Sequence, residues 1–183
     1  MTGTVHVALL RGVNVGGKHR LPMQALAEMF RDAGCADVRT YIQSGNVAFA
    51  ASATLARKVP AAVGAAITDR FGFDAPIVMR TAAELAGVVR RNPFLKAGAD
   101  PVTLHVAFLR DRPDKAQIDA LDPGVSPPDE FLVSGREVYL RCPNGIGRSK
   151  LTAPYFETRL RTVSTVRNWR TVLALLELSG RPC

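Results

Sequence analysis

The residues best suited to bind a charged ligand form a glycine-rich run close to the N-terminus. Residues 12–18 follow Arg11 directly and fit the pattern G-x-x-x-x-G-K, in which backbone N–H groups and a lysine hold phosphate groups. His19 stands where that pattern requires a serine or threonine to bind Mg²⁺. The run therefore argues against a nucleotide triphosphatase. It is compatible with a weaker anion-binding loop made of backbone N–H groups, Arg11 and Lys18.

A second candidate group lies at residues 44–46, with the sequence Ser-Gly-Asn. The flanking segments 38–43 and 46–50 are rich in strand-forming residues, and the two-residue connection between them predicts a β-hairpin. Residues 134–136, Ser-Gly-Arg, hold the matching place in the second half of the chain. Turn formation alone would explain the serine and the glycine. Asn46 has no counterpart there, which makes it the stronger candidate for a ligand contact.

The C-terminal third of the chain is strongly basic. Residues 136–170 contain eight Arg and Lys residues against two Glu, and so supply most of the formal net charge of +8. Arginine predominates over lysine, which suits bidentate contacts to phosphate or carboxylate. The codon usage of a GC-rich genome is the alternative explanation for this composition. The candidate ligand residues in this stretch are Lys150, Arg167, Asn168 and Trp169.

Trp169 has an alternative role in the core, because it begins an apolar stripe at helical spacing. The other members of this stripe are Val172, Leu173 and Leu176. Arg167 and Asn168, expected on the same helical turn, are explained less well by packing.

These groups need a scaffold, and the apolar pattern predicts the same scaffold twice. The strand sequence His-Val-Ala-Leu-Leu-Arg at 6–11 returns as His-Val-Ala-Phe-Leu-Arg at 105–110. The predicted strands span 5–10, 38–43, 46–50, 75–79, 102–110, 130–133, 137–141 and 162–166. The predicted helices span 22–33, 54–71, 81–91, 113–121, 153–161 and 167–178. Both halves therefore read β-α-β-β-α-β-α, which favours an internal duplication.

The predicted fold class is α+β, with two tandem ferredoxin-like copies (β-α-β-β-α-β plus an extra helix) and mainly antiparallel sheets. The first copy spans residues 1–91, a connector spans 92–101, and the second copy spans 102–183. The copies would form either two domains or one compact, two-lobed domain.

This topology predicts which candidate residues meet. The end of the first strand and the turn between the second and third strands share an edge of such a sheet. We therefore expect a pocket lined by Arg11, Asn14, Lys18, Ser44 and Asn46, with Arg167 approaching from the second copy. Residues 144–150 and 167–169 are expected to share the opposite edge in the second copy.

Four stretches of the sequence together resemble a known bacterial family. They are ALLRGVNVGG at 8–17, YIQSGNV at 41–47, SKL at 149–151 and RNWRTV at 167–172. In these motifs, and in their order along nearly the whole chain, the sequence resembles the family catalogued as domain of unknown function 1697. The resemblance implies a two-copy α+β fold of the ferredoxin-like kind and brings no established activity with it. Where that family often shows Arg-Asn-Trp-Asn, this chain has Arg170 as the fourth residue.

Several other classes of function find no support in the sequence. His6 and His105 begin equivalent strands, which favours packing, and His19 has no acidic or thiol partner nearby in sequence. The three cysteines, Cys35, Cys142 and Cys183, lie far apart. We therefore expect no metal site and no disulfide framework, and a reducing, cytoplasmic location. No apolar run approaches the ~20 residues of a membrane span, and no motif indicates a cofactor.

Two classes of function remain. The favoured one is a cytosolic bacterial protein that binds an anionic ligand, either a phosphorylated, nucleotide-like molecule or a nucleic acid. Against nucleic acid, the RNA-reading form of this fold places stacking aromatics on its first and third strands, where only Phe49 occurs. The alternative is a small-molecule enzyme that uses Arg, Lys, Asn and Ser without a metal, for which no general base is evident. The candidate ligand-binding residues are Arg11, Gly12, Asn14, Gly16, Lys18, Ser44, Gly45, Asn46, Lys150, Arg167, Asn168 and Trp169.

Overall fold

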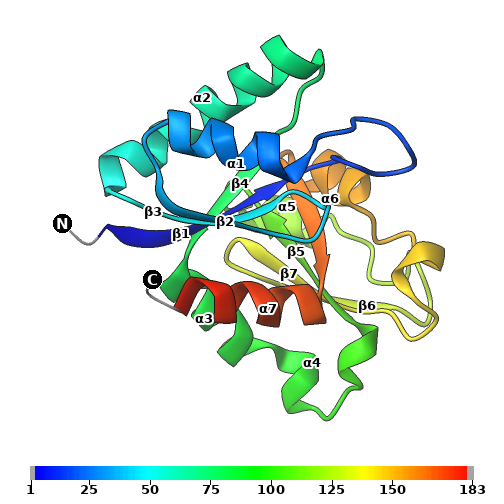
Figure 1. The fold of residues 1–183 in the computed structure, drawn as a ribbon. Helices are drawn as coiled ribbons and strands as arrows, with labels where there is room; N and C mark the ends of the chain where they lie inside the picture. The colour runs from blue at the N-terminus through cyan, green and yellow to red at the C-terminus, as the bar shows by residue number, and fades with distance from the viewer. Residues whose placement is uncertain (1–2, 181–183) are drawn as a thin grey trace. The chain divides into compact units, whose positions relative to one another are not determined.

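The computed structural model describes residues 3–180 of the 183-residue chain. It contains two four-stranded antiparallel sheets with helices, which confirms the predicted α+β class (Figure 1). Contacts group the described residues of Met1–Ala86 and Ala174–Cys183 into one compact unit, and Gly87–Leu173 into a second. Each unit holds one of the sheets, and the two are described separately below.

The first sheet has the strand order β2-β3-β1-β4, with β1 in the interior between two antiparallel neighbours. Its elements along the chain are β1 (Thr4–Leu10), α1 (Met23–Asp32), β2 (Ala36–Tyr41), β3 (Asn46–Ala51), α2 (Ala53–Phe71) and β4 (Ile77–Thr81). α3 (Ala82–Arg91) follows β4 and runs across the boundary between the units. Thr81 caps α3: its hydroxyl accepts the N–H of Glu84, and the Glu84 carboxylate accepts the N–H of Thr81.

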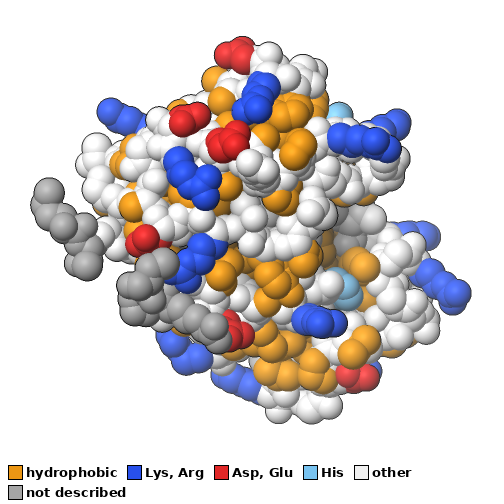
Figure 2. Space-filling model, viewed as in Figure 1, with side chains coloured by type: hydrophobic (Ala, Val, Ile, Leu, Met, Phe, Trp, Pro, Cys, Tyr) orange, Lys and Arg blue, Asp and Glu red, His pale blue; other side chains and the backbone are white. Residues whose placement is uncertain are grey.

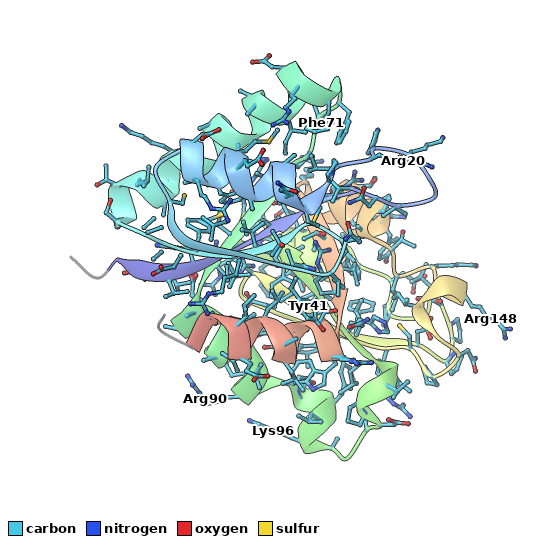
Figure 3. All side chains as sticks on the ribbon, in the orientation of Figure 1. Arg20, Tyr41, Phe71, Arg90, Lys96 and Arg148 are labelled. Atoms are coloured by element: carbon cyan, nitrogen blue, oxygen red, sulfur yellow. The ribbon has the colours of Figure 1, made fainter. Side chains whose placement is uncertain are left out.

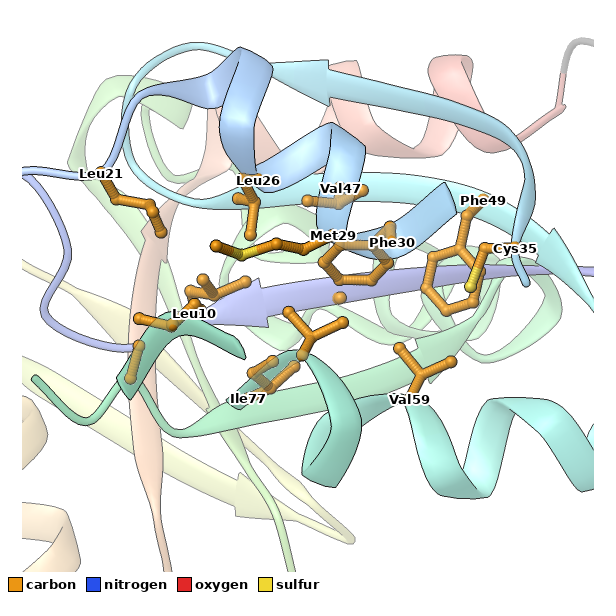
Figure 4. Close-up of a cluster of buried hydrophobic side chains, with 14 of the residues drawn as sticks. Leu10, Leu21, Leu26, Met29, Phe30, Cys35, Val47, Phe49, Val59 and Ile77 are labelled. Atoms are coloured by element: carbon orange, nitrogen blue, oxygen red, sulfur yellow. The ribbon is translucent and has the colours of Figure 1, made fainter. Parts of the chain in front are cut away.

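One face of this sheet packs against α1 and α2. Alternate residues of β1, Ala8 and Leu10, point to this face because side chains alternate along a strand. Phe30 of α1 and Phe49 of β3 meet there with ring centroids 5.1 Å apart (Figure 4). α2 adds Val59 and other apolar residues at helical spacing. This core fixes the end of β1, from which the glycine-rich loop leaves the sheet.

The second sheet has the order β6-β7-β5-β8, again with antiparallel neighbours. Its strands are β5 (Leu104–Leu109), β6 (Glu130–Ser134), β7 (Glu137–Arg141) and β8 (Ser164–Asn168). The helices of this part of the chain are α4 (Pro93–Lys96), η1 (Pro101–Thr103), α5 (Lys115–Asp119), η2 (Ile146–Arg148), α6 (Ala153–Leu160) and α7 (Trp169–Gly180). Ala107 and Leu109 of β5 pack with Phe156 and Leu160 of α6.

The connection between β2 and β3 differs from the expected two-residue turn. β2 ends at Tyr41 and β3 begins at Asn46, so the loop has four residues. The chain turns earlier than expected because Ile42 adopts a left-handed conformation with φ +48°. At the other end of the loop, the Gly45 carbonyl accepts the N–H of Leu10 at 2.8 Å.

The two hairpins therefore align differently from the sequence match. In the second sheet it is the Arg136 carbonyl that accepts the N–H of Leu109, at 2.9 Å. This bond is the counterpart of the bond from Leu10 to Gly45, so Gly45 and Arg136 hold the same place in their sheets. Asn46 then matches Glu137 rather than Arg136, and both side chains are buried.

Arg167 and Asn168 lie in β8 and not on the first turn of the last helix, where the sequence pattern placed them. The helix begins at Trp169, two residues later than expected, because the Asn168 side-chain oxygen accepts the N–H of Thr171 at 2.8 Å, as an N-cap does. The stripe that begins at Trp169 also differs from the expected one. Leu175 is fully buried, whereas Leu173 is exposed.

Within residues 3–180, no helix combines the length and the apolar character needed to cross a lipid bilayer.

Candidate functional site

The glycine-rich loop between β1 and α1 is itself a small hairpin. The N–H of Asn14 donates to the His19 carbonyl at 3.1 Å, and the N–H of Lys18 donates to the Val15 carbonyl at 3.1 Å. Gly16 and Gly17, at the tip, have φ of +59° and +75°. Two successive left-handed residues make a type I′ turn, which glycine forms without steric cost. The glycines are therefore explained by the shape of the loop.

Asn14 fixes this loop to the neighbouring hairpin loop. Its side-chain nitrogen donates to the Gln43 carbonyl at 2.7 Å and to the Leu21 carbonyl at 2.9 Å. Its side-chain oxygen accepts the N–H of Leu21 at 2.8 Å. The residue has φ +56°, a conformation that asparagine tolerates better than most residues. Both amide hydrogens are thus used by the backbone, which gives Asn14 a positioning role.

Gly45 brings the hairpin loop into contact with the start of the glycine-rich loop. A Cβ atom at this position would lie 2.6 Å from Val13 Cγ2 and 2.7 Å from Leu10 Cβ, and φ is +70°. No other residue fits there without displacing one of the two loops.

Asn46 and Ser44 hold the hairpin loop closed. The Asn46 side-chain nitrogen donates to the Tyr41 carbonyl at 3.1 Å and to Ser44 Oγ at 2.8 Å. Asn46 is completely buried and Ser44 is half-buried. The two residues lie at the edge where the sequence analysis expects them, close to the start of the glycine-rich loop.

A pocket of about 360 Å³ opens between the two loops. It is lined by Asn14, Gly17, Arg20, Leu21, Pro22 and Gln43. Leu21 and Pro22 give it an apolar part, while the side chains of Arg20 and Gln43 are exposed and polar. Of the expected lining residues, only Asn14 lines this pocket. Arg11 is half-buried, and its N–H donates to the Pro76 carbonyl at 2.9 Å.

Arg20 and Gln43 are site residues that the sequence patterns missed. Arg20 lies outside the glycine motif, at the base of the loop, and Figure 3 shows it on that segment. One signal could have found it. The first acidic residue of the chain is Glu28, so Arg11, Lys18 and Arg20 occupy a stretch with no negative side chain. Within residues 3–180, no carboxylate pairs with Lys18 or Arg20.

His19 anchors the far side of the loop. Its ring stacks on Phe73 with centroids 4.6 Å apart and an interplanar angle of 17°. Its Nδ1 lies 3.2 Å from the Gly12 carbonyl oxygen. These contacts give His19 a structural role.

The loop is not the phosphate-binding loop of nucleotide triphosphatases. That loop leads from a parallel strand straight into a helix. Here β1 is antiparallel to both neighbours, and α1 begins at Met23, five residues after Lys18. Lys18 lies in the loop hairpin and not at a helix N-terminus.

The C-terminal candidates all belong to β8, to α7 or to the loop before α6. Arg167 is 8% exposed, and its Nη1 donates to Thr165 Oγ1 at 2.7 Å and to the Val166 carbonyl at 3.0 Å. Burial lowers the pKa of Arg167 to about 10, which leaves it charged at neutral pH. Trp169 is 2% exposed, in agreement with the core role. Lys150 is exposed, and its backbone N–H donates to Ser126 Oγ at 3.0 Å. The expected approach of Arg167 to the glycine-rich loop stays a prediction.

Positive charge is not confined to the glycine-rich loop. In Figure 2 the Lys and Arg side chains are spread over the visible face, with fewer Asp and Glu side chains among them. Within residues 3–180, no group of three or more His, Cys, Asp and Glu side chains is close enough to hold a metal ion.

Comparisons with known proteins give a family and one solved structure of similar fold, and neither carries an activity. A family model described as "Protein of unknown function (DUF1697)" matches residues 3–139. A comparison with curated proteins gives no match. Among solved structures, the chain is similar to the conserved bacterial protein SP0830 from Streptococcus pneumoniae, with a TM-score of 0.73 and 19% identity. That match covers 97% of this chain and 99% of the other.

Proposed function

The chain belongs to this family of unknown function, and we propose that it binds a small phosphorylated ligand in the pocket between the glycine-rich loop and the hairpin loop. One observation carries the proposal. Arg20 lines a pocket that Asn14 and Gly45 hold in shape, in a part of the chain that has no acidic residue before Glu28. A guanidinium group is the usual protein partner of a phosphate, because its fork of donors matches the phosphate oxygens.

The composition of the pocket supports a nucleotide-like molecule. Its volume of about 360 Å³ is within the range of small-molecule sites. The exposed Pro22 offers an apolar surface for a base or another flat group, beside the polar side chains of Arg20 and Gln43. The lining residues include no His, Asp, Glu or Cys, so the pocket favours binding over acid–base catalysis.

The experiment is a calorimetric titration of the protein with two probes, inorganic phosphate and adenosine monophosphate. We expect Arg20→Ala to weaken binding of the better probe roughly tenfold, about 1.4 kcal/mol. The matched control is Arg31→Ala, which removes an exposed arginine from the last turn of α1 and leaves the pocket intact. Equal affinities for the two variants, or no binding of either probe to the unchanged protein, would refute the proposal.

We also infer that each sheet belongs to a ferredoxin-like copy that arose by duplication, with the copies at 1–91 and 102–183. The shared strand order supports this. So does the position of a buried arginine in each sheet. Arg80 pairs with Val7, and Arg167 pairs with Val106, at matching positions of the last strand. Each donates to the carbonyl of the residue before it, at 2.7 Å for Arg80 and 3.0 Å for Arg167.

A cytoplasmic location belongs to the same proposal. Cys35 and Cys142 are buried free thiols, as expected of a protein in a reducing compartment.

A further inference from the structure

Gln43 supplies the pocket between the glycine-rich loop and the hairpin loop with an uncharged polar side chain that the fold does not use. Among the other lining residues, Gly17, Leu21 and Pro22 have no polar side chain. The side chain of Asn14 spends its two amide hydrogens and its oxygen on the backbone of the two loops. In the part of the chain that the structure describes, the Gln43 side-chain amide has no hydrogen-bond partner. This amide is therefore available to a ligand.

The backbone that carries this side chain is held on both sides. The carbonyl of Gln43 accepts the Asn14 amide at 2.7 Å. Two residues earlier, the Tyr41 carbonyl accepts the Asn46 amide at 3.1 Å. Two residues later, the loop closes at Gly45, where a Cβ atom would lie 2.6 Å from its nearest neighbour. On a backbone fixed in this way, a side chain loses only its own rotamer freedom when it binds, which favours a specific contact.

The chemistry of the amide indicates what it would bind. A carboxamide offers a hydrogen-bond donor and an acceptor side by side. It therefore pairs with a group that presents an acceptor next to a donor, as adenine does with N7 and its exocyclic amino group. A phosphate offers acceptors only, for which the guanidinium group of Arg20 is the better partner. The exposed Pro22 lines the same pocket and gives a flat group an apolar surface.

We propose that Gln43 recognises the base of a nucleotide, so that the pocket selects adenine nucleotides over phosphorylated molecules without the exocyclic amino group. The inference rests on the proposed function, since it needs Arg20 to hold the phosphate. The two residues belong to different loops, and the pocket lies between these loops, so one ligand contacts both. Arg20 then gives affinity for any phosphate, and Gln43 gives the choice of what the phosphate is attached to.

The test compares three phosphorylated probes by calorimetry. They are adenosine monophosphate, purine riboside monophosphate, which lacks only the exocyclic amino group, and ribose 5-phosphate, which lacks the base. The variant is Gln43→Ala, which keeps the link between the loops because Asn14 bonds to the backbone carbonyl of Gln43. The matched control is Gln24→Ala, which removes an exposed glutamine of α1 that does not line the pocket.

We expect the unchanged protein and the control to bind adenosine monophosphate about fivefold more tightly than purine riboside monophosphate, as one hydrogen bond between neutral groups would give. Gln43→Ala should bind these two probes with equal affinity. It should also keep the affinity of the unchanged protein for ribose 5-phosphate, because Arg20 is still in place.

Three results would overturn the inference and leave the proposed function standing. They are equal affinities of the unchanged protein for the two purine probes, a preference that survives in Gln43→Ala, and an equal loss of affinity for all three probes in that variant. The last result would mean that Gln43 shapes the pocket and does not read the base. If the unchanged protein binds none of the probes, the proposed function itself fails and this inference fails with it.

Discussion

Asn14 and Gln43 are joined by a hydrogen bond of 2.7 Å, although 29 residues separate them in the chain. The bond ties the glycine-rich loop to the hairpin loop, and the pocket lies between the two. Asn14 shapes the pocket by holding its walls, and Arg20 supplies its charge.

Replacing Asn14 should therefore affect the stability of the protein more directly than its ligand binding. We expect Asn14→Ala to lower the free energy of unfolding by about 1–3 kcal/mol, because three hydrogen bonds disappear and backbone groups stay unsatisfied. Asn14→Gly should lose slightly less, since glycine adopts the left-handed conformation freely. Urea denaturation measures both. A variant that unfolds like the unchanged protein would show that the amide is not the link between the loops.

Gly45 tests the close contact between the same two loops. Gly45→Ala should cost about 2–4 kcal/mol, from overpacking against Leu10 and Val13 together with the left-handed backbone. Gly72→Ala is the matched control. It shares a left-handed φ of +74° but has no atom within 4 Å of the added Cβ, so it should cost only about 1 kcal/mol, the cost of a Cβ in the left-handed conformation. Equal losses would mean that the contact with Leu10 and Val13 relaxes without cost.

Two buried histidines predict that the protein is less stable in mild acid. Burial is the main cause that lowers the pKa of His6 and of His105 below the ordinary value of 6.5. The unfolded chain therefore takes up these protons first. The stability that the two neutral histidines contribute is fully present above the pKa of the unfolded chain. It is lost as pH falls through 6.5 toward the pKa values of the folded protein.

The variant His6→Gln with His105→Gln provides the check. With the ionic strength held constant, its free energy of unfolding should vary less between about pH 7.5 and pH 5 than that of the unchanged protein. His19→Gln is a suitable control because His19 is exposed. If the double variant keeps the full dependence on pH, carboxylates and not these histidines cause it.

Trp169 allows a core role to be separated from a ligand role. We expect Trp169→Ala to destabilise the protein by about 3–5 kcal/mol, since the ring is almost completely buried. Trp169→Phe should recover most of that loss and leave the affinity for adenosine monophosphate unchanged. A Trp169→Phe protein that folds normally but no longer binds the probe would instead make the ring a ligand platform.

The sequence predicted the parts of the structure that depend on apolar periodicity. The alternation in β1 and the helical spacing of α1 are strong signals, because a wrong assignment would expose core residues such as Leu10 and Phe30. Topology predicts that the end of β1 lies near the turn between β2 and β3, and the bond from Leu10 to Gly45 joins these two segments.

Other parts depend on interactions between distant residues, which a local pattern cannot show. The four-residue loop requires a left-handed Ile42, a conformation that isoleucine rarely adopts and that no motif signals. The start of α7 depends on one cap by Asn168, which moves Arg167 into a strand. Arg20 and Gln43 line one pocket because the hydrogen bond from the Asn14 amide holds the two loops together, and no local pattern shows this bond.

The exposed tip of the glycine-rich loop also makes the pocket accessible to chemical labelling. Val15 lies beside the turn at Gly16 and is 65% exposed, so a cysteine would replace it without disturbing the core. The thiols of Cys35 and Cys142 are buried, and burial raises the pKa of each to about 11, which keeps them almost unreactive at neutral pH. With Cys183→Ser as a precaution, Val15→Cys would carry a single environment-sensitive dye next to the pocket. The fluorescence of this dye would report which of many candidate molecules bind in the pocket.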